Sequence, residues 1–469
     1  MNTINPETAQ PVTKMRRLRD RLRDGAASNG IWASLQQVCN LLFVGLLSVI
    51  LARTLSIEDF GVYSYAMSLA GLGIAIGLAG LYGLAIKRYS ESRDPGAVTC
   101  SIIIVREITV AFYFVVLLGF MGSTATSAEQ FLLVALAGVA VFGRVLDAPE
   151  LWYQAELNAR KPAIAKIAVA AAFFVMKCAA LRLGSGVTEI VLLYVAELFT
   201  ASIAVLLCYR RDVTTGRAFA VPAARDVVEL WKRSFPLLIS GVAQQVNLRA
   251  SLIVVQILVG ATGVAMFAVS QRVMDVCLAL PPMAYMTATF PALLEARRRD
   301  RERGGTSEYR HRLQRSFDSA LWAGIAIAVA LFMLSDIVVV TAFGAEYADA
   351  AELLRIQSIA VPFMFMSSVL SKWIIAEGNL WISVGRHWLG AVATVALCLL
   401  LVPAWGGAVG GRLGEHGVLR DVGLPVHVPV PIHLAGGGPD VPCLAGAGPP
   451  RPHPCRISES GALKCSIDR

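Results

Sequence analysis

Long apolar runs separated by short polar segments dominate the first 400 residues of the chain. Most runs are continuous and reach the roughly 20 residues that an α-helix needs to cross a bilayer. Strands of a membrane barrel would instead alternate apolar and polar residues over about ten positions. The pattern therefore predicts an all-α, polytopic membrane protein with about 11 transmembrane helices, near residues 31–52, 62–86, 101–121, 130–149, 163–182, 189–209, 235–258, 264–293, 319–343, 353–376 and 387–402.

The apolar hairpin over residues 235–293 is the stretch around which we expect the function to be organised. Its two predicted helices are joined by the turn G-A-T-G at 260–263, and each helix carries an arginine well inside it, Arg249 and Arg272. A cation at that depth costs at least about 2.5 kcal/mol, so both side chains are expected to face protein or a hydrated cavity. The proline pair at 281–282 donates no backbone hydrogen bonds, which predicts a kink or break in the second helix.

Positive charge is concentrated in alternate loops. Lysine and arginine crowd the N-terminal stretch 14–23 and the loops after the second, fourth, sixth and eighth predicted helices, whereas the other loops carry little. By the positive-inside rule, the N-terminus and the basic loops are cytoplasmic. We therefore interpret residues 1–30 as a cytoplasmic amphipathic segment, and the net charge of +9 as a topology signal rather than a nucleic-acid footprint.

A weak internal repeat divides the chain into two halves. The pattern W-x-x-A-E-x-N begins at Trp152, near the end of the fourth predicted helix, and again at Trp373, near the end of the tenth. Repeats six helices apart share one orientation and are related by an axis along the membrane normal. The expected organisation is two pseudo-symmetric lobes around a central cavity: a six-helix lobe, a cytoplasmic linker and a lobe of about five helices, at 31–209, 210–234 and 235–410.

The last 59 residues differ in composition from the rest of the chain. Residues 411–469 contain no Phe, Tyr, Trp or Met, and they hold four of the six histidines. When residues 411–420 are back-translated with GC-rich codons and read one base later, a membrane-like sequence appears. We expect 411–469 to be a disordered, frameshifted tail that truncates the second lobe.

Charged residues inside the predicted helices are candidates for lining the cavity. Arg272 with Asp275, and Arg144 with Asp147, have the i,i+3 spacing at which helix side chains meet, so we expect internal ion pairs. Such pairs can also open and close during a transport cycle. Glu197, which has no cation nearby in the sequence, is the candidate for coupling to protons or sodium.

Polar and terminal positions complete the candidate set. Asn40, Gln244 and Asn247 can line a groove toward a polar substrate, or they can form interhelical hydrogen bonds worth about 0.6 kcal/mol each. Arg53 and Lys177 lie near predicted helix ends, where we expect them to extend to the membrane interface.

No cofactor or metal site is predicted. The nine cysteines are scattered, with no C-x-x-C pair and no cysteine–histidine cluster, so packing is their expected role. The loops show no D-x-D pattern and no grouping of His and Glu. The loops therefore argue against a membrane enzyme.

Several short segments together resemble a known transporter family. They are L-A-R-T-L and E-D-F-G-V-Y within 51–63, N-L-R-A-S at 247–251, Q-R-V at 271–273 and A-E-Y at 345–347. In order and spacing, over about residues 30–410, the chain is similar to the polysaccharide transporter family of the multidrug/oligosaccharidyl-lipid/polysaccharide exporter superfamily. That family includes flippases of O-antigen and exopolysaccharide repeat units.

The resemblance implies a substrate and partners. The expected activity is the movement of undecaprenyl-diphosphate-linked oligosaccharide across the bacterial inner membrane by alternating access between two lobes. Polysaccharide polymerase and chain-length proteins are the implied partners, besides the lipid bilayer itself. Arg249 is then expected to contact the diphosphate, because a guanidinium binds phosphate oxygens in a bidentate way; the alternative is a buried pair with a carboxylate of the other lobe.

A second function remains open from the residues. A cation-coupled multidrug antiporter of the same superfamily would place carboxylates at mid-membrane and aromatic walls around a cationic drug. Glu197 is the residue that favours this alternative, whereas the arginines of the hairpin favour the flippase.

Overall fold

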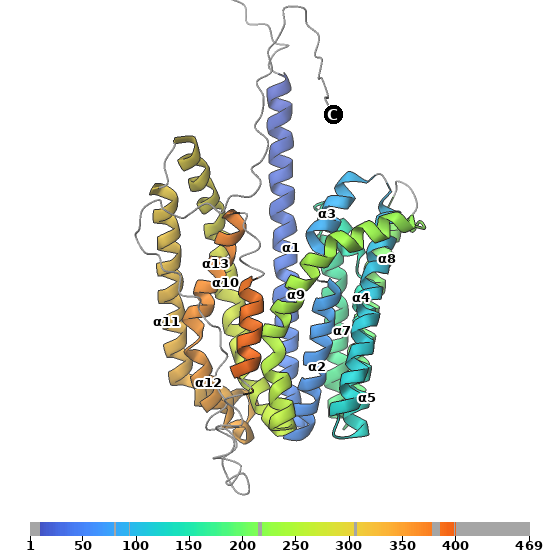
Figure 1. Ribbon diagram of the computed structural model, residues 1–469, viewed down its shortest axis with the longest axis vertical. Helices are drawn as coiled ribbons and strands as arrows, with labels where there is room; N and C mark the ends of the chain where they lie inside the picture. The colour runs from blue at the N-terminus through green and yellow to red at the C-terminus, as the bar shows by residue number, and fades with distance from the viewer. Residues whose placement is uncertain are drawn as a thin grey trace, which may run out of the picture. The chain divides into compact units, whose positions relative to one another are not determined.

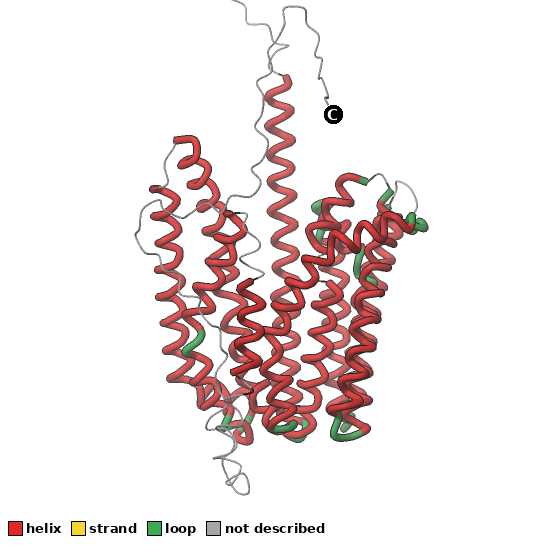
Figure 2. Tube along the Cα trace, viewed as in Figure 1, coloured by secondary structure: helices red, strands yellow, loops and turns green. Residues whose placement is uncertain are grey.

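The computed structural model describes residues 10–399, except 79–80, 93, 214–217, 304–306, 378–384 and 398. Every regular element in this part of the chain is a helix, and the connections are short (Figure 2). The elements, shown in Figure 1, are α1 (Gln10–Thr54), α2 (Ile57–Leu78), α3 (Leu81–Glu91), α4 (Pro95–Thr124), α5 (Ala128–Val145), α6 (Pro149–Ala155), α7 (Arg160–Arg182), α8 (Val187–Asp212), α9 (Ala224–Leu258), α10 (Ala261–Arg303), α11 (Ser307–Phe343), the 3-10 helix η2 (Ala345–Tyr347), α12 (Ala350–Ser358) and α13 (Val361–Glu377). A further helix begins at residue 385 and continues to 397.

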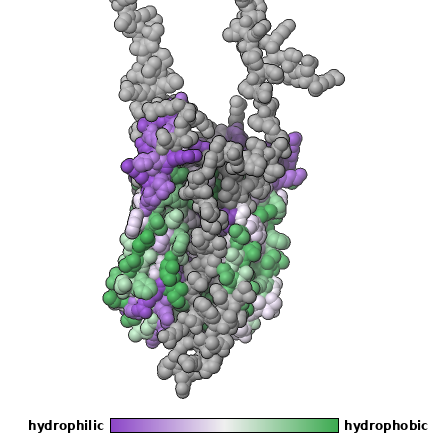
Figure 3. Space-filling model, turned by 60° about the vertical axis from the view of Figure 1, so that its left-hand side comes forward, coloured by the Kyte–Doolittle hydropathy of each residue, from purple (hydrophilic) through white to green (hydrophobic). Residues whose placement is uncertain are grey.

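The length and apolarity of these helices confirm a polytopic membrane protein. Seven described helices are long and apolar enough to cross a membrane, and the number rises to nine if each of two bent pairs is one span. The remaining two predicted spans lie in α10 and in the helix over 385–397. In Figure 3, hydrophobic side chains cover the middle of the visible face and hydrophilic ones gather toward one end. Exposed residues such as Phe112 and Val115 fit contact with lipid.

The helices pack in two groups. In the first group α2, α4, α5, α7 and α8 pack against one another, and α1 joins through α7. In the second group α10, α11, α12 and α13 are in mutual contact. The helix α9 contacts both α2 and α4 of the first group as well as α10, and α2 packs along α10. These groups are compatible with the predicted lobes, whose exact boundaries and duplication stay predictions.

The turn of the hairpin forms as the sequence predicts. Between α9 and α10, Gly260 has a φ of +89°, a left-handed conformation that glycine adopts without steric cost. Of the predicted kink or break at the proline pair, the break is wrong, because α10 is helical through residues 281–282, and the kink stays a prediction. Membrane helices tolerate proline where neighbouring groups satisfy the freed carbonyls. The bend lies instead in α9, whose two parts, 224–246 and 248–258, meet at 50°.

The two groups meet closely at the end where α9 turns into α10. A Cβ atom on Gly61 of α2 would lie only 2.0 Å from the backbone oxygen of Ala261, so α2 and α10 touch through their backbones there. The ring of Phe60 meets that of Tyr347 edge-on, with 5.9 Å between centroids. Burial, followed by the charge of Glu346, raises the pKa of the Tyr347 hydroxyl to about 12, which keeps it neutral.

Arg53 adds a polar contact at the same end. Its Nε donates to the carbonyl oxygen of Ala342 at 2.8 Å, and its Nη2 donates to that of Thr341. These carbonyls belong to the last turn of α11, where helix oxygens lack partners and carry partial negative charge. The side chain of Arg53 is exposed and binds the second helix group at this end, and its extension to the membrane interface stays a prediction.

The structure describes part of the predicted N-terminal segment and none of the predicted tail. The predicted segment 1–30 overlaps α1, which begins at Gln10 and is continuous into the first span, although side chains are described only from residue 28. The predicted tail at 411–469 lies outside the described residues.

Candidate functional site

Arg249 lies where α9 passes α2, just after the bend of α9. A Cβ atom on Gly71 would be 2.7 Å from Cζ of Arg249, so the guanidinium rests against the α2 backbone at a position that only glycine leaves open. Within the described part of the chain, the one hydrogen bond from this side chain is long, 3.5 Å from Nη1 to the carbonyl oxygen of Ser68, and Nε is buried without a partner. A guanidinium has five N–H donors, so most of this capacity is unfilled.

Among the described residues, no carboxylate neutralises Arg249 directly. Among the described ion pairs, which extend to 4.0 Å, none includes this residue. The alternative of a buried pair with a carboxylate of the other helix group is therefore not found in the described part of the chain. Such a side chain in an apolar protein is costly unless an anion or water completes its contacts.

The surroundings of Arg249 combine aromatic hydroxyls with a second cation. Arg272, Asp275, Tyr194 and Tyr113 all interact electrostatically with Arg249. The Tyr113 hydroxyl is fixed, because it donates to the carbonyl oxygen of Leu69 at 2.6 Å. The structure thus brings both hairpin arginines together with tyrosines of the first helix group.

Arg272 forms the predicted pair with Asp275, and the pair is loose. The Nη1 to Oδ2 distance is 3.8 Å, and both side chains are partly exposed, at 33% and 43%. Gln271 also donates to Asp275, at 3.3 Å. The 3.8 Å between Arg272 and Asp275 is longer than a normal hydrogen bond, so the Arg272 donors are available to another anion. Tyr63 of α2 lies within the electrostatic reach of Arg272 and of Glu197.

Glu197 is paired, although the sequence shows no cation near it. The Nζ of Lys177, on the neighbouring helix α7, donates to the Glu197 carboxylate, and only 4% of the Lys177 side chain is exposed. The same ammonium lies 5.4 Å from the centre of the Tyr194 ring. The expectation that Lys177 extends to the interface is wrong, because the side chain turns inward to this pair.

A larger buried charge network lies in the first helix group. Asp147 accepts from Lys166 at 2.8 Å and pairs with Arg144 at 3.0 Å, as the sequence predicts, and with Arg106 at 3.4 Å. Lys166 also donates to Glu150. The sequence signal for the two additional cations was available, since Arg106 and Lys166 both fall inside predicted spans. Their common partner comes from folding, because it lies in the turn between α5 and α6.

The uncharged candidates are less well placed. Asn40 and Gln244 are exposed, and no described hydrogen bond joins either to Arg249. The side chain of Asn247 lies outside the description, although the residue sits at the bend of α9. Among the described residues no group of three His, Cys, Asp or Glu side chains is arranged to hold a metal ion.

With this geometry established, comparison with known proteins assigns the family. A sequence model of the family described as "Polysaccharide biosynthesis protein" matches residues 26–297, more than half of the chain. The chain belongs to this family. The match includes the hairpin arginines and every helix of the first group, so it confirms the family resemblance. A sequence comparison with curated proteins finds no match.

Solved structures of transporters share the fold. A lipid II flippase MurJ in an inward closed conformation superposes with a TM-score of 0.65 at 13% identity, over 80% of this chain and 82% of that one. The Vibrio cholerae MATE transporter VcmN gives 0.55 at 13% identity, over 83% and 92%. An outward-facing MATE transporter of the MOP superfamily gives 0.52 at 15% identity, over 83% and 92%. At these identities the likeness establishes the fold alone.

Proposed function

We propose that the protein is a flippase that moves a lipid-linked oligosaccharide across the bacterial inner membrane by alternating access. The observation that carries this proposal is Arg249, a mostly buried guanidinium at the meeting of α9 and α2 that has no carboxylate partner among the described residues. A diphosphate supplies the charge and the acceptor oxygens that this group lacks. Arg272 interacts electrostatically with Arg249, so its charge would add to the attraction for the same anion.

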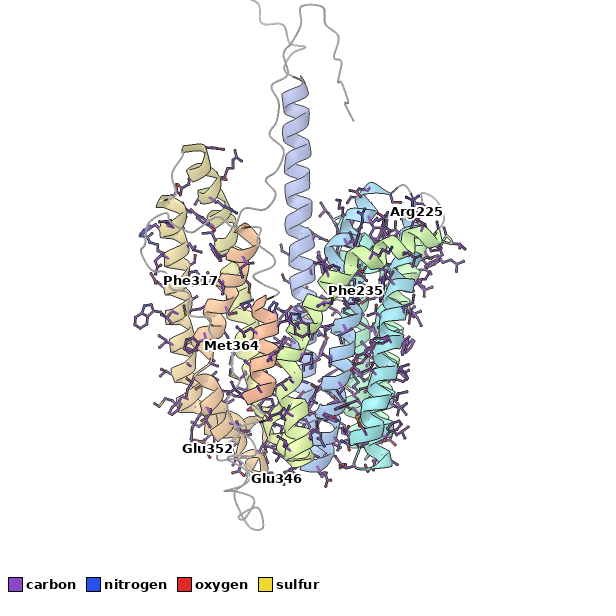
Figure 4. All side chains as sticks on the ribbon, in the orientation of Figure 1. Arg225, Phe235, Phe317, Glu346, Glu352 and Met364 are labelled. Atoms are coloured by element: carbon purple, nitrogen blue, oxygen red, sulfur yellow. The ribbon has the colours of Figure 1, made fainter. Side chains whose placement is uncertain are left out.

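The distribution of charge supports an orientation of the protein in the membrane. Figure 4 places Arg225 at one end of the helices and Glu346 and Glu352 at the other. Under the positive-inside rule the end with Arg225 is cytoplasmic, and so is the N-terminus. The close contact between Gly61 and Ala261 then seals the outer side, which suits a state that is open or opening toward the cytoplasm.

The multidrug antiporter is the weaker proposal. It requires an available carboxylate to exchange a proton or sodium ion for a cationic drug. Glu197 holds Lys177 in an ion pair, and Asp147 holds three cations. Neither carboxylate is free to bind a further cation without losing a buried partner. Polymerase and chain-length proteins remain proposed partners that follow from the flippase assignment.

Complementation tests the proposal. The chain, with its natural end and with the reading frame shifted after residue 410, is expressed in cells that lack their repeat-unit flippase, and surface polysaccharide is measured. We expect Arg249→Ala to reduce the restored polysaccharide about tenfold or more, as loss of a charge-assisted contact implies. Arg249→Lys should restore part of it.

Arg298→Ala is the matched control. This arginine is exposed, and its described ion pair is with Glu302 of the same helix, so its loss should leave polysaccharide unchanged at equal membrane abundance. Full restoration by Arg249→Ala would remove Arg249 from the mechanism and, with it, the observation on which the proposal rests.

A further inference from the structure

A second set of cationic and hydroxyl side chains lies far along the chain from Arg249. Ser367 and Ser371, one turn apart on α13, face Arg386 and His387 at the start of the helix over 385–397. Arg386 donates from Nη1 to Ser367 Oγ at 2.7 Å and from Nη2 to Ser371 Oγ at 3.1 Å. Its Nη2 also lies 3.3 Å from His387 Nε2. We call these four residues the serine–arginine cluster.

The serine–arginine cluster has no negative charge. No described ion pair includes Arg386, and its described partners are two hydroxyl groups and an imidazole. Its Nε and the Nδ1 of His387 are both buried and have no hydrogen-bond partner. Buried polar atoms are normally paired, so two such atoms in one cluster call for an explanation.

The unfilled positions of the cluster are all donors. Arginine has donors only, so His387 Nε2 must accept from it, and the neutral ring then carries its proton on Nδ1. The Ser371 hydroxyl donates to the carbonyl oxygen of Ser367, whereas no acceptor is found for the hydroxyl proton of Ser367. Three donors therefore remain without a described acceptor: Arg386 Nε–H, His387 Nδ1–H and Ser367 O–H. Three donors around one positive charge match an anion with several acceptor oxygens, such as a phosphate.

The position of the cluster indicates where that anion comes from. On the helix over 385–397, Trp388, Leu389 and Val392 are exposed, at 44%, 54% and 62%, whereas Ala391 and Thr394 are buried. Arg386 precedes this apolar face and is half-buried. An exposed tryptophan beside an arginine at the end of a membrane helix is typical of the level of lipid headgroups. The apolar face can contact the lipid tail while the cluster holds the headgroup.

We propose that the serine–arginine cluster binds the phosphate group of a membrane lipid. Arg386 supplies the charge and a donor, Ser367 and His387 supply further donors, and the face of Trp388, Leu389 and Val392 contacts the acyl or isoprenyl chain. The lipid is either a bulk anionic phospholipid or an isoprenyl diphosphate, since both present the same phosphate oxygens. The site is separate from Arg249 and does not depend on the flippase proposal.

Native mass spectrometry of the full chain in a neutral detergent tests the site by counting bound lipids. The probes are farnesyl diphosphate with farnesol as its phosphate-free control, dioleoylphosphatidylglycerol with dioleoylglycerol as its control, and inorganic pyrophosphate. We expect at least one phosphate-bearing lipid to bind, and its phosphate-free control to bind about tenfold more weakly or worse. Preference between the two lipids identifies the source, and equal binding of pyrophosphate would show that the tail contributes nothing.

Two substitutions locate the binding. Arg386→Gln should weaken the binding of the phosphate lipid about tenfold or more, and Ser367→Ala, which leaves the charge in place, should weaken it by a smaller factor. Arg355→Gln, on an exposed arginine of α12 that pairs with Asp336, is the matched control and should bind as the unchanged protein does. If Arg386→Gln fails to fold by size-exclusion chromatography, Ser367→Ala decides.

Failure of this proposal is distinguishable from failure of the flippase proposal. Farnesyl diphosphate can also bind at Arg249. A bound copy that is lost in Arg249→Gln but retained in Arg386→Gln belongs to the Arg249 site. Lipid lost only in Arg386→Gln and Ser367→Ala belongs to the serine–arginine cluster. Unchanged binding in both Ser367→Ala and Arg386→Gln, or binding of farnesol and dioleoylglycerol as tight as that of their phosphate partners, would overturn the proposed site.

Discussion

Arg249 depends on the absence of a side chain at Gly71. The guanidinium occupies the space that a β-carbon at Gly71 would take, at 2.7 Å, and the flexible end of the arginine can yield at small cost. A single methyl group therefore moves the cation without breaking the packing of α2 against α9. A substitution at Gly71 therefore tests the position of the Arg249 charge, whereas a substitution of Arg249 tests its presence.

We predict that Gly71→Ala lowers flippase activity while the protein remains folded. The added methyl displaces the Arg249 guanidinium, and misplacement of about 1 Å can cost on the order of a hundredfold in an activity that depends on geometry. Polysaccharide restored in the complementation assay is the measurement. Gly45→Ala is the control, because nothing lies within 4 Å of the corresponding Cβ in α1. Equal restoration by the two variants would contradict the placement of Arg249.

Asp147 has a structural role that its i,i+3 pair with Arg144 alone does not reveal. Its carboxylate is 4% exposed and contacts three cations from three segments of the first helix group. Removal of its charge leaves Arg106, Arg144 and Lys166 with Glu150 as the remaining carboxylate of the network. Uncompensated buried charge is among the more destabilising changes that one substitution can make.

Asp147→Asn should destabilise the protein by about 3–5 kcal/mol, the usual cost of breaking a buried pair. Thermal unfolding in detergent measures this. Asp336→Asn is the comparison, because Asp336 is 59% exposed and pairs with a single arginine, for which about 1 kcal/mol or less is expected. A similar small change for both variants would mean that the Asp147 network contributes no more than a surface pair.

At the scale of elements, α1 and α11 are joined through the side chain of Arg53. The fork of this arginine binds the last carbonyls of α11, so it links the first helix group to the second at the end where Gly61 meets Ala261. A cation at a helix C-terminus contributes about 0.3–1 kcal/mol when exposed and up to about 2 kcal/mol when partly buried. Arg53 is exposed, so the lower range applies, and it shifts an equilibrium between closed and open states about twofold to fivefold.

Arg53→Ala should therefore open this end more often. A cysteine replaces Ala265, one turn after Ala261 on α10 and fully buried, in a background without the native cysteines, and its labelling by a soluble thiol reagent is timed. We expect faster labelling in Arg53→Ala, and an intermediate rate in Arg53→Lys, which keeps the charge without the fork. Identical rates in all three proteins would show that Arg53 does not hold the ends of α1 and α11 together.

For the whole molecule, the sequence predicts the helices well, because the length of each apolar run matches the length that a helix needs to span the membrane. Within the described residues, each of the eleven predicted spans falls on one helix or on two consecutive helices, and the left-handed Gly260 is where the turn requires it. The proline pair does not break α10, because neighbouring helices, and not local geometry alone, decide whether a membrane helix breaks.

The site was harder to predict than the fold, since partners from different helices meet only after packing. Pairs at i,i+3, such as Arg144 with Asp147, can be found from spacing. Lys177 with Glu197, and Arg53 with α11, join residues 20 and 289 positions apart. No periodicity links such positions, and the unfilled donors of Arg386 and His387 become visible only when their neighbours are in place.

The central claim, that Arg249 contacts the phosphate of the transported lipid between two groups of helices, is tested most directly in vesicles. The purified protein is reconstituted, and movement of a fluorescent isoprenyl-diphosphate-linked sugar across the bilayer is followed by quenching from one side. We predict movement with the unchanged protein, a loss of about tenfold or more with Arg249→Ala, and unchanged rates with Arg298→Ala. Movement at the full rate with Arg249→Ala would contradict the claim.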